Sequence, residues 1–495
     1  MFLGIDVGTQ SVKAILYDSD LRRVIDIRSA PLRLTSTTDG ARTQQSQWWI
    51  TALALCLAGF NKTDRSRVKA IGVSGQQHGL VPLGLDDEVL APVKLWCDTS
   101  TVAECAQITE RFGGQARCIE EVGNAILPGY TAPKILWLKN NLPAAYSRLA
   151  TIFLPHDYIN FYLTGERAME CGDASGTGMF DIRQRAWHQG MLAAVDPDRD
   201  LSTTLPSLVA ADVPMGELHA KAASALDLPV GVPVASGGGD NMMAAIGTGN
   251  VSPGRLTASL GTSGTLFASA EKPIIDPEGA VAAFCSSTGN WLPLFCTMNC
   301  TGSTELTRSL FSMSINTLER RVAGTSAGSN GVMTLPFFNG ERSPNLPKAK
   351  GCILGLDESN YCSDNLLRSA MESAVYGLRG GLDRFAKLGC EIDTVRLTGG
   401  GAGSTVWCQM IADIFNLPVS VQTVDEGAAL GAALQALWMY QRLQGERITL
   451  QRLVDEHLTL DPIRACVPRN DSVQKYKEVY SDYLRHVEAI TTLYN

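Results

Sequence analysis

An acidic residue that follows a glycine run near the middle of the chain is the strongest candidate for chemistry. Residues 236–241 read Ser-Gly-Gly-Gly-Asp-Asn, after a short apolar run and before a helix-like stretch that begins at Met242. Glycines at the end of a strand let other groups approach the backbone closely. Asp240 is therefore a candidate general base that takes one proton from a bound hydroxyl. The position also suits a helix N-cap, since aspartate is a favoured cap residue.

Two Gly-Thr turns, each between short apolar strands, are candidates for holding an anion. The first follows Asp6 and contains Thr9, and the second contains Thr262 and Ser263. Backbone N–H groups in such turns form a concavity that binds phosphates, and the hydroxyls add donors. Plain hairpin turns have a similar composition. Asp6 is placed to bind Mg²⁺ beside phosphates, or alternatively to stabilise its turn as an Asx residue.

A third glycine-rich turn, Gly399-Gly400-Gly401, ends an expected strand and precedes a helix that Ser404 is expected to cap. The turn matches a dinucleotide-binding fingerprint only weakly, and it also suits a flat adenosine pressed against the backbone. The sequence G-x-x-x-x-G-K-[ST] does not occur in the chain, which excludes a P-loop nucleotide enzyme.

Gln76, Gln77 and His78 lie at another glycine-flanked strand end. A run of hydrogen-bonding side chains suits a sugar or polyol, because a site built in this way rejects analogues that lack a hydroxyl. A lone histidine is also common as a structural residue, so His78 carries both interpretations.

The elements that would position these residues recur in the same order along the chain. The pattern predicts strands over 2–5, 12–17, 23–27, 68–73 and 92–96, and a helix over 47–60. Gly-Thr turns, strand-to-glycine stretches (68–75 and 395–400) and helix starts led by an acid (240 and 425) each appear twice. The order indicates two similar α/β domains made by duplication. We expect them over 1–247 and 248–495, divided by the glycine, serine and proline stretch 247–253.

Composition restricts the class of protein. Hydrophobic residues make up 45% and charged residues 19% of the 495 residues, and the net charge of −8 disfavours a nucleic-acid partner. No apolar run reaches the ~18 residues of a membrane span, and the first residues lack the basic region of a signal peptide. Thirteen scattered cysteines without a C-x-x-C pair favour reduced thiols. We therefore expect a cytoplasmic protein with no nucleic-acid or membrane partner.

The ordered motifs resemble the FGGY carbohydrate kinases, and among these most closely the kinases of ketopentoses. The resemblance rests on G-I-D-V-G-T from Gly4, S-G-Q-Q-H-G from Ser74, S-G-G-G-D-N from Ser236, S-L-G-T-S-G from Ser259 and T-G-G-G-A-G-S from Thr398. Stretches 129–141 and 351–372 are similar to the two signatures of the family. Together the motifs cover nearly the whole chain.

The resemblance implies two ribonuclease H-like domains of the actin/hexokinase type, with an interdomain cleft that closes on a sugar and MgATP. It implies ATP-dependent phosphorylation of a ketopentose, with D-xylulose as the first candidate and Asp240 as general base, and it places Asp6 near Mg²⁺. The expected sugar-binding residues are Gln77, His78, Asp240, Asn241 and Trp96. The expected nucleotide-binding residues are Thr9, Thr262, Ser263, Gly399, Gly400, Gly401 and Ser404. A homodimer is a further expectation of the resemblance.

Three positions depart from the family pattern. Gln77 stands where many relatives have methionine, Ser100 where many have arginine, and His156 where lysine is common. Since Gln77 lies at the expected sugar site, the alternative is the same fold acting on ribulose, a pentitol, gluconate or glycerol. A non-catalytic nucleotide-binding protein of the actin superfamily would be expected to lack the base and the sugar-facing turn, and this chain has both.

Overall fold

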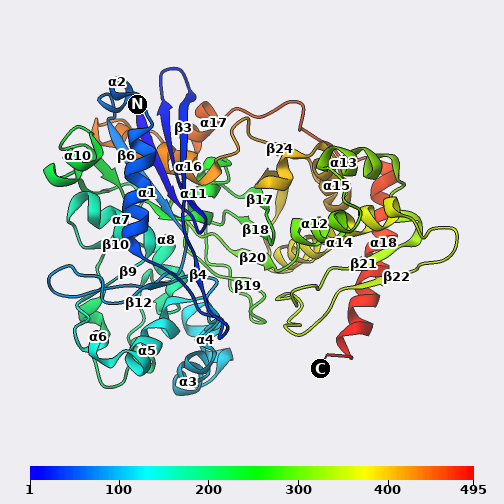
Figure 1. Ribbon diagram of the computed structural model, residues 1–495, viewed down its shortest axis with the longest axis horizontal. Helices are drawn as coiled ribbons and strands as arrows, with labels where there is room; N and C mark the ends of the chain where they lie inside the picture. Colours follow the sequence, from blue (N-terminus) through cyan, green and yellow to red (C-terminus); the bar gives the residue numbers. More distant parts are fainter. Residues whose placement is uncertain (495) are drawn as a thin grey trace. The chain divides into compact units, whose positions relative to one another are not determined.

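The computed structural model describes residues 1–494 and contains two compact units (Figure 1). Unit 1 comprises Met1–Val251, Ser269–Pro293 and Glu426–Leu458. Unit 2 comprises Ser252–Ala268, Leu294–Asp425 and Thr459–Asn495. Each unit is therefore built from separate stretches of chain, and unit 1 includes a long helix from the second half of the sequence.

The sheet of unit 1 is mixed, with strand order β14-β15-β6-β1-β2-β3 and β16 pairing with β6. Strands β1, β2 and β3 form the expected antiparallel meander, and β6 and β15 add to it in parallel with β1. The bounds are β1 (Phe2–Val7), β2 (Ser11–Asp18), β3 (Arg23–Pro31), β6 (Ala70–Gly75), β14 (Pro214–Glu217), β15 (Pro233–Ala235) and β16 (Gly238–Gly239).

Alternate residues of β1 face opposite sides of this sheet, as the pleat requires. Leu3, Ile5 and Val7 are fully buried in a core that also includes Trp49 of α1 (Ser46–Ala58) and residues of α7 (Pro155–Thr164). Gly4, on the other face, lies against α16 (Gly427–Leu443). The β1 residues on the α16 face include Asp6, which places its carboxylate near the start of that helix.

Glycines allow α16 to pack directly on the backbone of unit 1. A Cβ at Gly72 of β6 would lie 2.0 Å from the carbonyl oxygen of Ala432. A Cβ at Gly247, the last residue of α11 (Asp240–Gly247), would lie 1.9 Å from the carbonyl oxygen of Gly427. The helix that begins at Asp240 is therefore held against α16 at backbone contact distance.

Shorter elements surround the sheet of unit 1. The expected strand over 92–96 is limited to β8 (Val93–Lys94), because the chain turns at once and the Asp98 amide donates to the Leu95 carbonyl. The other strands are β4 (Thr35–Ser36), β5 (Arg42–Gln44), β7 (Val81–Leu83), β9 (Thr151–Phe153), β10 (Ala168–Glu170), β11 (Phe180–Asp181), β12 (Ala186–Trp187), β13 (Ser207–Val209) and β19 (Val281–Ala282). The other helices are α2 (Lys62–Arg65), α3 (Val102–Phe112), α4 (Gln115–Val122), α5 (Thr131–Asn141), α6 (Pro143–Ser147), α8 (Cys171–Ala174), α9 (Gln189–Val195), α10 (Ala220–Leu226) and α17 (Leu450–His457).

Unit 2 repeats the sheet topology of unit 1. Its strands run in the order β20-β18-β17-β23-β24, with an antiparallel meander followed by two parallel additions. These are β17 (Gly254–Leu260), β18 (Gly264–Ala268), β20 (Leu294–Thr297), β23 (Ile392–Thr398) and β24 (Val419–Val421). The main helices are α12 (Thr301–Leu310), α13 (Ile315–Gly324), α14 (Ser363–Lys387), α15 (Thr405–Phe415) and α18 (Asn470–Thr491), with a small β21 (Met333–Leu335) and β22 (Cys352–Leu354) hairpin. The shared topology confirms the expected pair of ribonuclease H-like α/β folds.

Two further sequence expectations concern the whole chain. All thirteen cysteines are free thiols. Across residues 1–494, a search for helices with the length and hydropathy of a membrane span finds none.

Candidate active site

Asp240 is the first residue of α11, and Gly239 occupies the N-cap position. The interpretation of Asp240 as the N-cap is therefore wrong, because the cap lies one residue earlier. The Oδ1 atom of Asp240 accepts a hydrogen bond of 2.8 Å from the Asn241 amide. The Asn241 side-chain amide donates to the same oxygen at 3.0 Å and to Oε1 of Gln77 at 2.9 Å. The structure thus brings together three residues that the sequence analysis assigned to the sugar site.

The carboxyl group of Asp240 is tuned for proton transfer near neutrality. Its side chain keeps some solvent access but lies deep among protein atoms. Burial first, and then the negative charges of Asp6 and Asp173, raise its pKa to about 7, because each charge disfavours a second carboxylate nearby. A base with a pKa near the working pH is the kind that general base catalysis favours.

Asp6 lies on β1 directly opposite Ser74 of β6, and the Ser74 hydroxyl donates to its Oδ1 at 2.7 Å. This oxygen is therefore engaged by the neighbouring strand. Burial raises the pKa of Asp6, partly offset by the Ser74 hydrogen bond and by Lys13. Lys13 itself forms an ion pair of 2.6 Å with Glu426, beside the start of α16.

His78 is held in an unusual backbone conformation. Its φ of +63° is in the left-handed region, which residues other than glycine seldom adopt and which is concentrated at functional sites. Its ring centroid lies 4.8 Å from that of Tyr130, and a Cβ at Gly176 would be 2.4 Å from the imidazole. The Nζ of the buried Lys134 donates to the His78 carbonyl at 2.7 Å. Contacts to both the backbone carbonyl and the imidazole ring of His78 therefore hold this turn in place.

Trp96 and Thr9 lie together at the edge of the same region. The Trp96 indole donates to the Thr9 hydroxyl at 2.9 Å, and that hydroxyl donates to Oε1 of the buried Gln76 at 3.0 Å. The indole ring is about half exposed. The structure therefore places Thr9, an expected nucleotide-binding residue, in unit 1 among expected sugar-site residues.

A buried ion-pair cluster behind the site was not predicted. His156 Nδ1 lies 2.8 Å from Asp173 Oδ2 and its Nε2 lies 2.9 Å from Asp157 Oδ1, with all three side chains inaccessible to solvent. Burial opposes the charged imidazole, but Asp157 and Asp173 outweigh it and raise the pKa of His156 well above its usual value. His156 in the Leu-Pro-x-Asp-Tyr motif is a sequence signal for this cluster, whereas Asp173 lies in a run of small residues that forms no motif.

Unit 2 contains a pocket of about 800 Å³ at its glycine-rich turn. Four expected nucleotide-binding residues line it: Thr262, Gly400, Gly401 and Ser404. Ser263 and Gly399 are their chain neighbours but are not among the lining residues. Residues that the sequence analysis missed also line the pocket, among them Thr301, Thr304, Leu306, Ile315, Asn339 and Trp407.

The local structure explains why this turn is rich in glycine. Gly399 has a φ of +83°, and a Cβ there would lie 2.9 Å from the Leu260 carbonyl oxygen. A Cβ at Gly401 would lie 2.8 Å from the Leu260 side chain. Ser404 caps α15, as expected, by accepting a 3.3 Å hydrogen bond from the Trp407 amide. Side chains at Gly399 and Gly401 would therefore collide with Leu260.

Comparison with known protein families identifies the family of the chain. The N-terminal domain of the FGGY family of carbohydrate kinases matches residues 1–247, and the C-terminal domain of that family matches residues 256–440. The chain belongs to the FGGY family of carbohydrate kinases. It is therefore an ATP-dependent sugar kinase, and the family and enzyme class expected from its motifs are confirmed.

Relatives of this FGGY kinase match over its whole length. It is 42% identical over 497 residues to the xylulose kinase of Haemophilus influenzae, with 99% of this chain and all of that protein covered. It is 34% identical over 438 residues to the xylulose kinase of Escherichia coli K12, covering 88% and 89% of the two chains. A crystal structure from Brucella ovis, described as a xyloylose kinase, superposes with a TM-score of 0.91 at 30% identity and covers 99% of both chains.

Proposed function

We propose that this FGGY kinase transfers the γ-phosphoryl group of ATP to a hydroxyl of D-xylulose, giving D-xylulose 5-phosphate. The observation that carries the proposal is the 42% identity, over essentially the full length, to a protein named xylulose kinase. The cluster of Asp240, Asn241 and Gln77 supports it, because it offers a base beside groups that bind hydroxyls.

In this mechanism Asp240 accepts the proton of the attacking hydroxyl, and Asn241 holds the carboxylate by donating to Oδ1. Gln77 connects this base to the buried cluster, because its Oε1 accepts from the Asn241 amide and its side chain stabilises the Asp173 carboxylate. Gln77 is therefore proposed to bind the sugar and to hold Asn241 in place.

The pocket of unit 2 is the proposed nucleotide site. Its threonine hydroxyls and glycine backbone suit phosphates, while Leu306 and Ile315 add apolar surface for the adenine ring.

Asp6 is the proposed Mg²⁺ residue. In the described part of the chain no group of three or more His, Cys, Asp or Glu side chains could hold a metal. A single carboxylate such as Asp6 is compatible with Mg²⁺, because this ion usually keeps several waters and binds one or two carboxylates plus phosphates. When bound, the ion would offset the charge of the phosphates.

The acid limb of the pH profile tests the base. Asp240 must be ionised to accept a proton, and burial together with the charges of Asp6 and Asp173 raises its pKa to about 7. We therefore expect kcat/KM to fall about tenfold per pH unit below that value. The measurement is kcat/KM for the sugar from pH 5.5 to 9 at saturating ATP. In Asp6→Asn the limb should move to lower pH, since the negative charge that raises the pKa is removed. A profile that stays flat down to pH 5.5 would contradict the assignment.

A substrate panel tests the proposed sugar. We expect kcat/KM for D-xylulose to exceed that for L-xylulose, D- and L-ribulose, D-arabinitol, xylitol, gluconate and glycerol by at least about a hundredfold, or ~2.7 kcal/mol. The readout is sugar-dependent ADP release, with Gln77→Met as a companion because many relatives have methionine there. Preference for another polyol would establish the alternative, in which the Gln77–His78 turn serves a different substrate.

The homodimer and the cytoplasmic location belong to the same proposal. The first rests on the family resemblance, and the second on the scattered cysteines and the lack of a signal-peptide pattern. Light scattering of the purified chain at micromolar concentration would test the first, and cell fractionation would test the second.

A further inference from the structure

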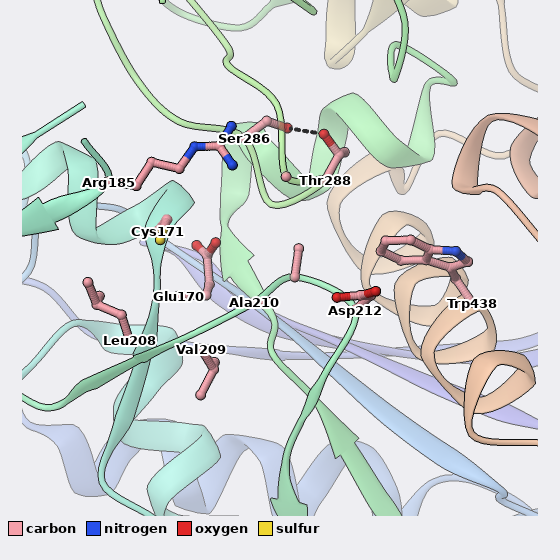
Figure 2. Close-up of a pocket in the computed structure, with 12 residues that line it drawn as sticks. Glu170, Cys171, Arg185, Leu208, Val209, Ala210, Asp212, Ser286, Thr288 and Trp438 are labelled. Carbon is pink, nitrogen blue, oxygen red and sulfur yellow. Dashed lines mark hydrogen bonds between the residues drawn. The ribbon is translucent and has the colours of Figure 1, made fainter. Parts of the chain in front are cut away.

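Unit 1 contains a second pocket, of about 490 Å³, that includes none of the residues of the candidate active site. Figure 2 shows its walls. They come from the end of β10, the turn between β11 and β12, β13 with the connection to β14, the loop at 286–289 and the C-terminal half of α16. A volume of this size is typical of sites for small ligands. Nothing in the proposed reaction uses it.

The pocket combines hydrogen-bond donors, acceptors and an aromatic ring. The Arg185 guanidinium stacks on Trp291, with 4.1 Å from Cζ to the ring centroid, and its buried Nε has no hydrogen-bond partner among residues 1–494. The hydroxyls of Ser286 and Thr288 lie 3.1 Å apart in the same wall (Figure 2). The Trp438 ring lines the pocket from α16.

The positive and negative charges in and beside the pocket nearly balance, which favours an uncharged ligand over a charged one. The single positive charge of Arg185 is opposed by the carboxyl groups of Glu170 and Asp212. Asp212 is itself paired with Arg442 at 3.0 Å. Burial raises the pKa of Glu170 to about 7, so its carboxyl group can donate as well as accept near neutrality. Mixed donors and acceptors beside an indole match a neutral molecule with several hydroxyls and one apolar face.

Two hydrogen-bonded connections lead from this pocket toward Asp240. The Glu170 carboxylate accepts from the Asp173 amide at 2.5 Å, and Asp173 binds His156 in the buried cluster behind the active site. Ser287, between the two lining hydroxyl residues, accepts through its carbonyl from Gln435 Nε2 at 3.2 Å. Gln435 Oε1 in turn accepts from the Gly237 amide at 2.9 Å, within the glycine run before Asp240.

We propose that this pocket is a second binding site for a small neutral polyol, and that its occupancy alters turnover at the Asp240 site. The ligand would donate to Glu170 or Asp212, accept from Arg185 and the lining hydroxyls, and place its C–H face on Trp438. Binding of a polyol in this pocket does not depend on the proposed function. The effect of the polyol on turnover does rest on the proposed function.

Hydrogen exchange with xylitol as the probe, in the absence of ATP, tests binding on the full-length chain. We expect xylitol to slow exchange at 208–212 and 286–289, the two backbone stretches in the pocket wall. The protection should vanish in Arg185→Met, which removes a donor. It should also vanish in Ala210→Trp, because the exposed Ala210 lines the pocket and a tryptophan side chain there would block it. Arg183→Met, two residues away on an exposed side chain, should retain it.

Kinetics test the coupling with the same variants. At saturating sugar, xylitol should still change kcat of wild type and of Arg183→Met, and should leave kcat of Arg185→Met unchanged. If the chain did not phosphorylate D-xylulose, the proposed function would fail, but the hydrogen-exchange experiment would still decide whether the pocket binds xylitol. Absence of protection in wild type, persistence of protection in both pocket variants, or the same protection from inorganic phosphate but not from xylitol would overturn the proposal.

Discussion

Replacing Asp240 with asparagine is expected to lower kcat by about 10³-fold, within the ~10²–10⁴ that general base catalysis contributes. Asparagine keeps the shape of the side chain but cannot accept the proton. The Kd for ATP should change less than twofold, because the proposed nucleotide pocket is lined by residues of unit 2. The measurements are steady-state ADP release and equilibrium binding of ATP to the same preparation.

The variant should not be less stable than wild type at pH 8. The pKa of Asp240 is about 7 in the folded chain and near 3.8 in the unfolded chain, so the ionised carboxylate costs stability fully above about pH 7. This cost falls as the pH decreases from 7 toward 4, and asparagine removes it. A loss of activity with an undiminished thermal midpoint at pH 8 therefore reports chemistry rather than unfolding.

Asp227→Asn is the matched control for this experiment. Asp227 is an exposed residue with a φ of +50°, a conformation that asparagine also tolerates, and it pairs with Arg65 at 3.0 Å. Exposed ion pairs contribute ~0–1 kcal/mol, so this variant should retain wild-type kcat. If Asp240→Asn stayed within about tenfold of wild type, a barrier change of only ~1.4 kcal/mol, Asp240 would not be the base.

Replacing Gly72 with alanine is expected to lower the thermal midpoint by about 5 °C, from a destabilisation of ~3 kcal/mol in a unit of this size. The new Cβ would lie 2.0 Å from the Ala432 carbonyl oxygen and 2.6 Å from its carbonyl carbon. These are backbone atoms in the middle of α16, so the contact can be relieved only by moving the helix away from the sheet. Because α16 also packs against α11, kcat should fall as well.

Gly324→Ala is the control, since no atom lies within 4 Å of a Cβ placed at the last residue of α13. Differential scanning calorimetry of both variants measures the effect. Equal midpoints would show that α16 does not need the glycine contact with β6.

Much of the candidate site was predictable because its signals are local. An acid after a glycine run, a Gly-Thr turn between strands and a polar run at a strand end each depend on neighbouring residues in the chain. The duplication was readable for the same reason, since three short motifs recur in one order and the two sheets share their topology. These signals predicted the α/β class, the placement of Gln77 near Asn241 and the Ser404 helix cap.

Other features depended on contacts between residues that are distant in the sequence. His156 and Asp173 form a buried pair across 17 positions, and neither has a periodic or motif signal that specifies the other. The strand expected over 92–96 has only two residues, because the Asp98 amide closes a turn with the Leu95 carbonyl directly after it. The strand propensity of 92–96 does not predict this turn.

The sequence by itself determined the family, the enzyme class and the identities of the residues at strand ends, because glycine conformations and charged side chains act within a few residues. Only the tertiary structure decided which of them meet and with what pKa. Asp240 owes its raised pKa to burial and to Asp6 and Asp173, which other elements bring to it. Desolvation and charge–charge repulsion depend on distances in space. The packing of α16 against β1, β6 and α11 holds the helix that begins at Asp240 beside the strand that carries Asp6, although these elements are far apart in the sequence.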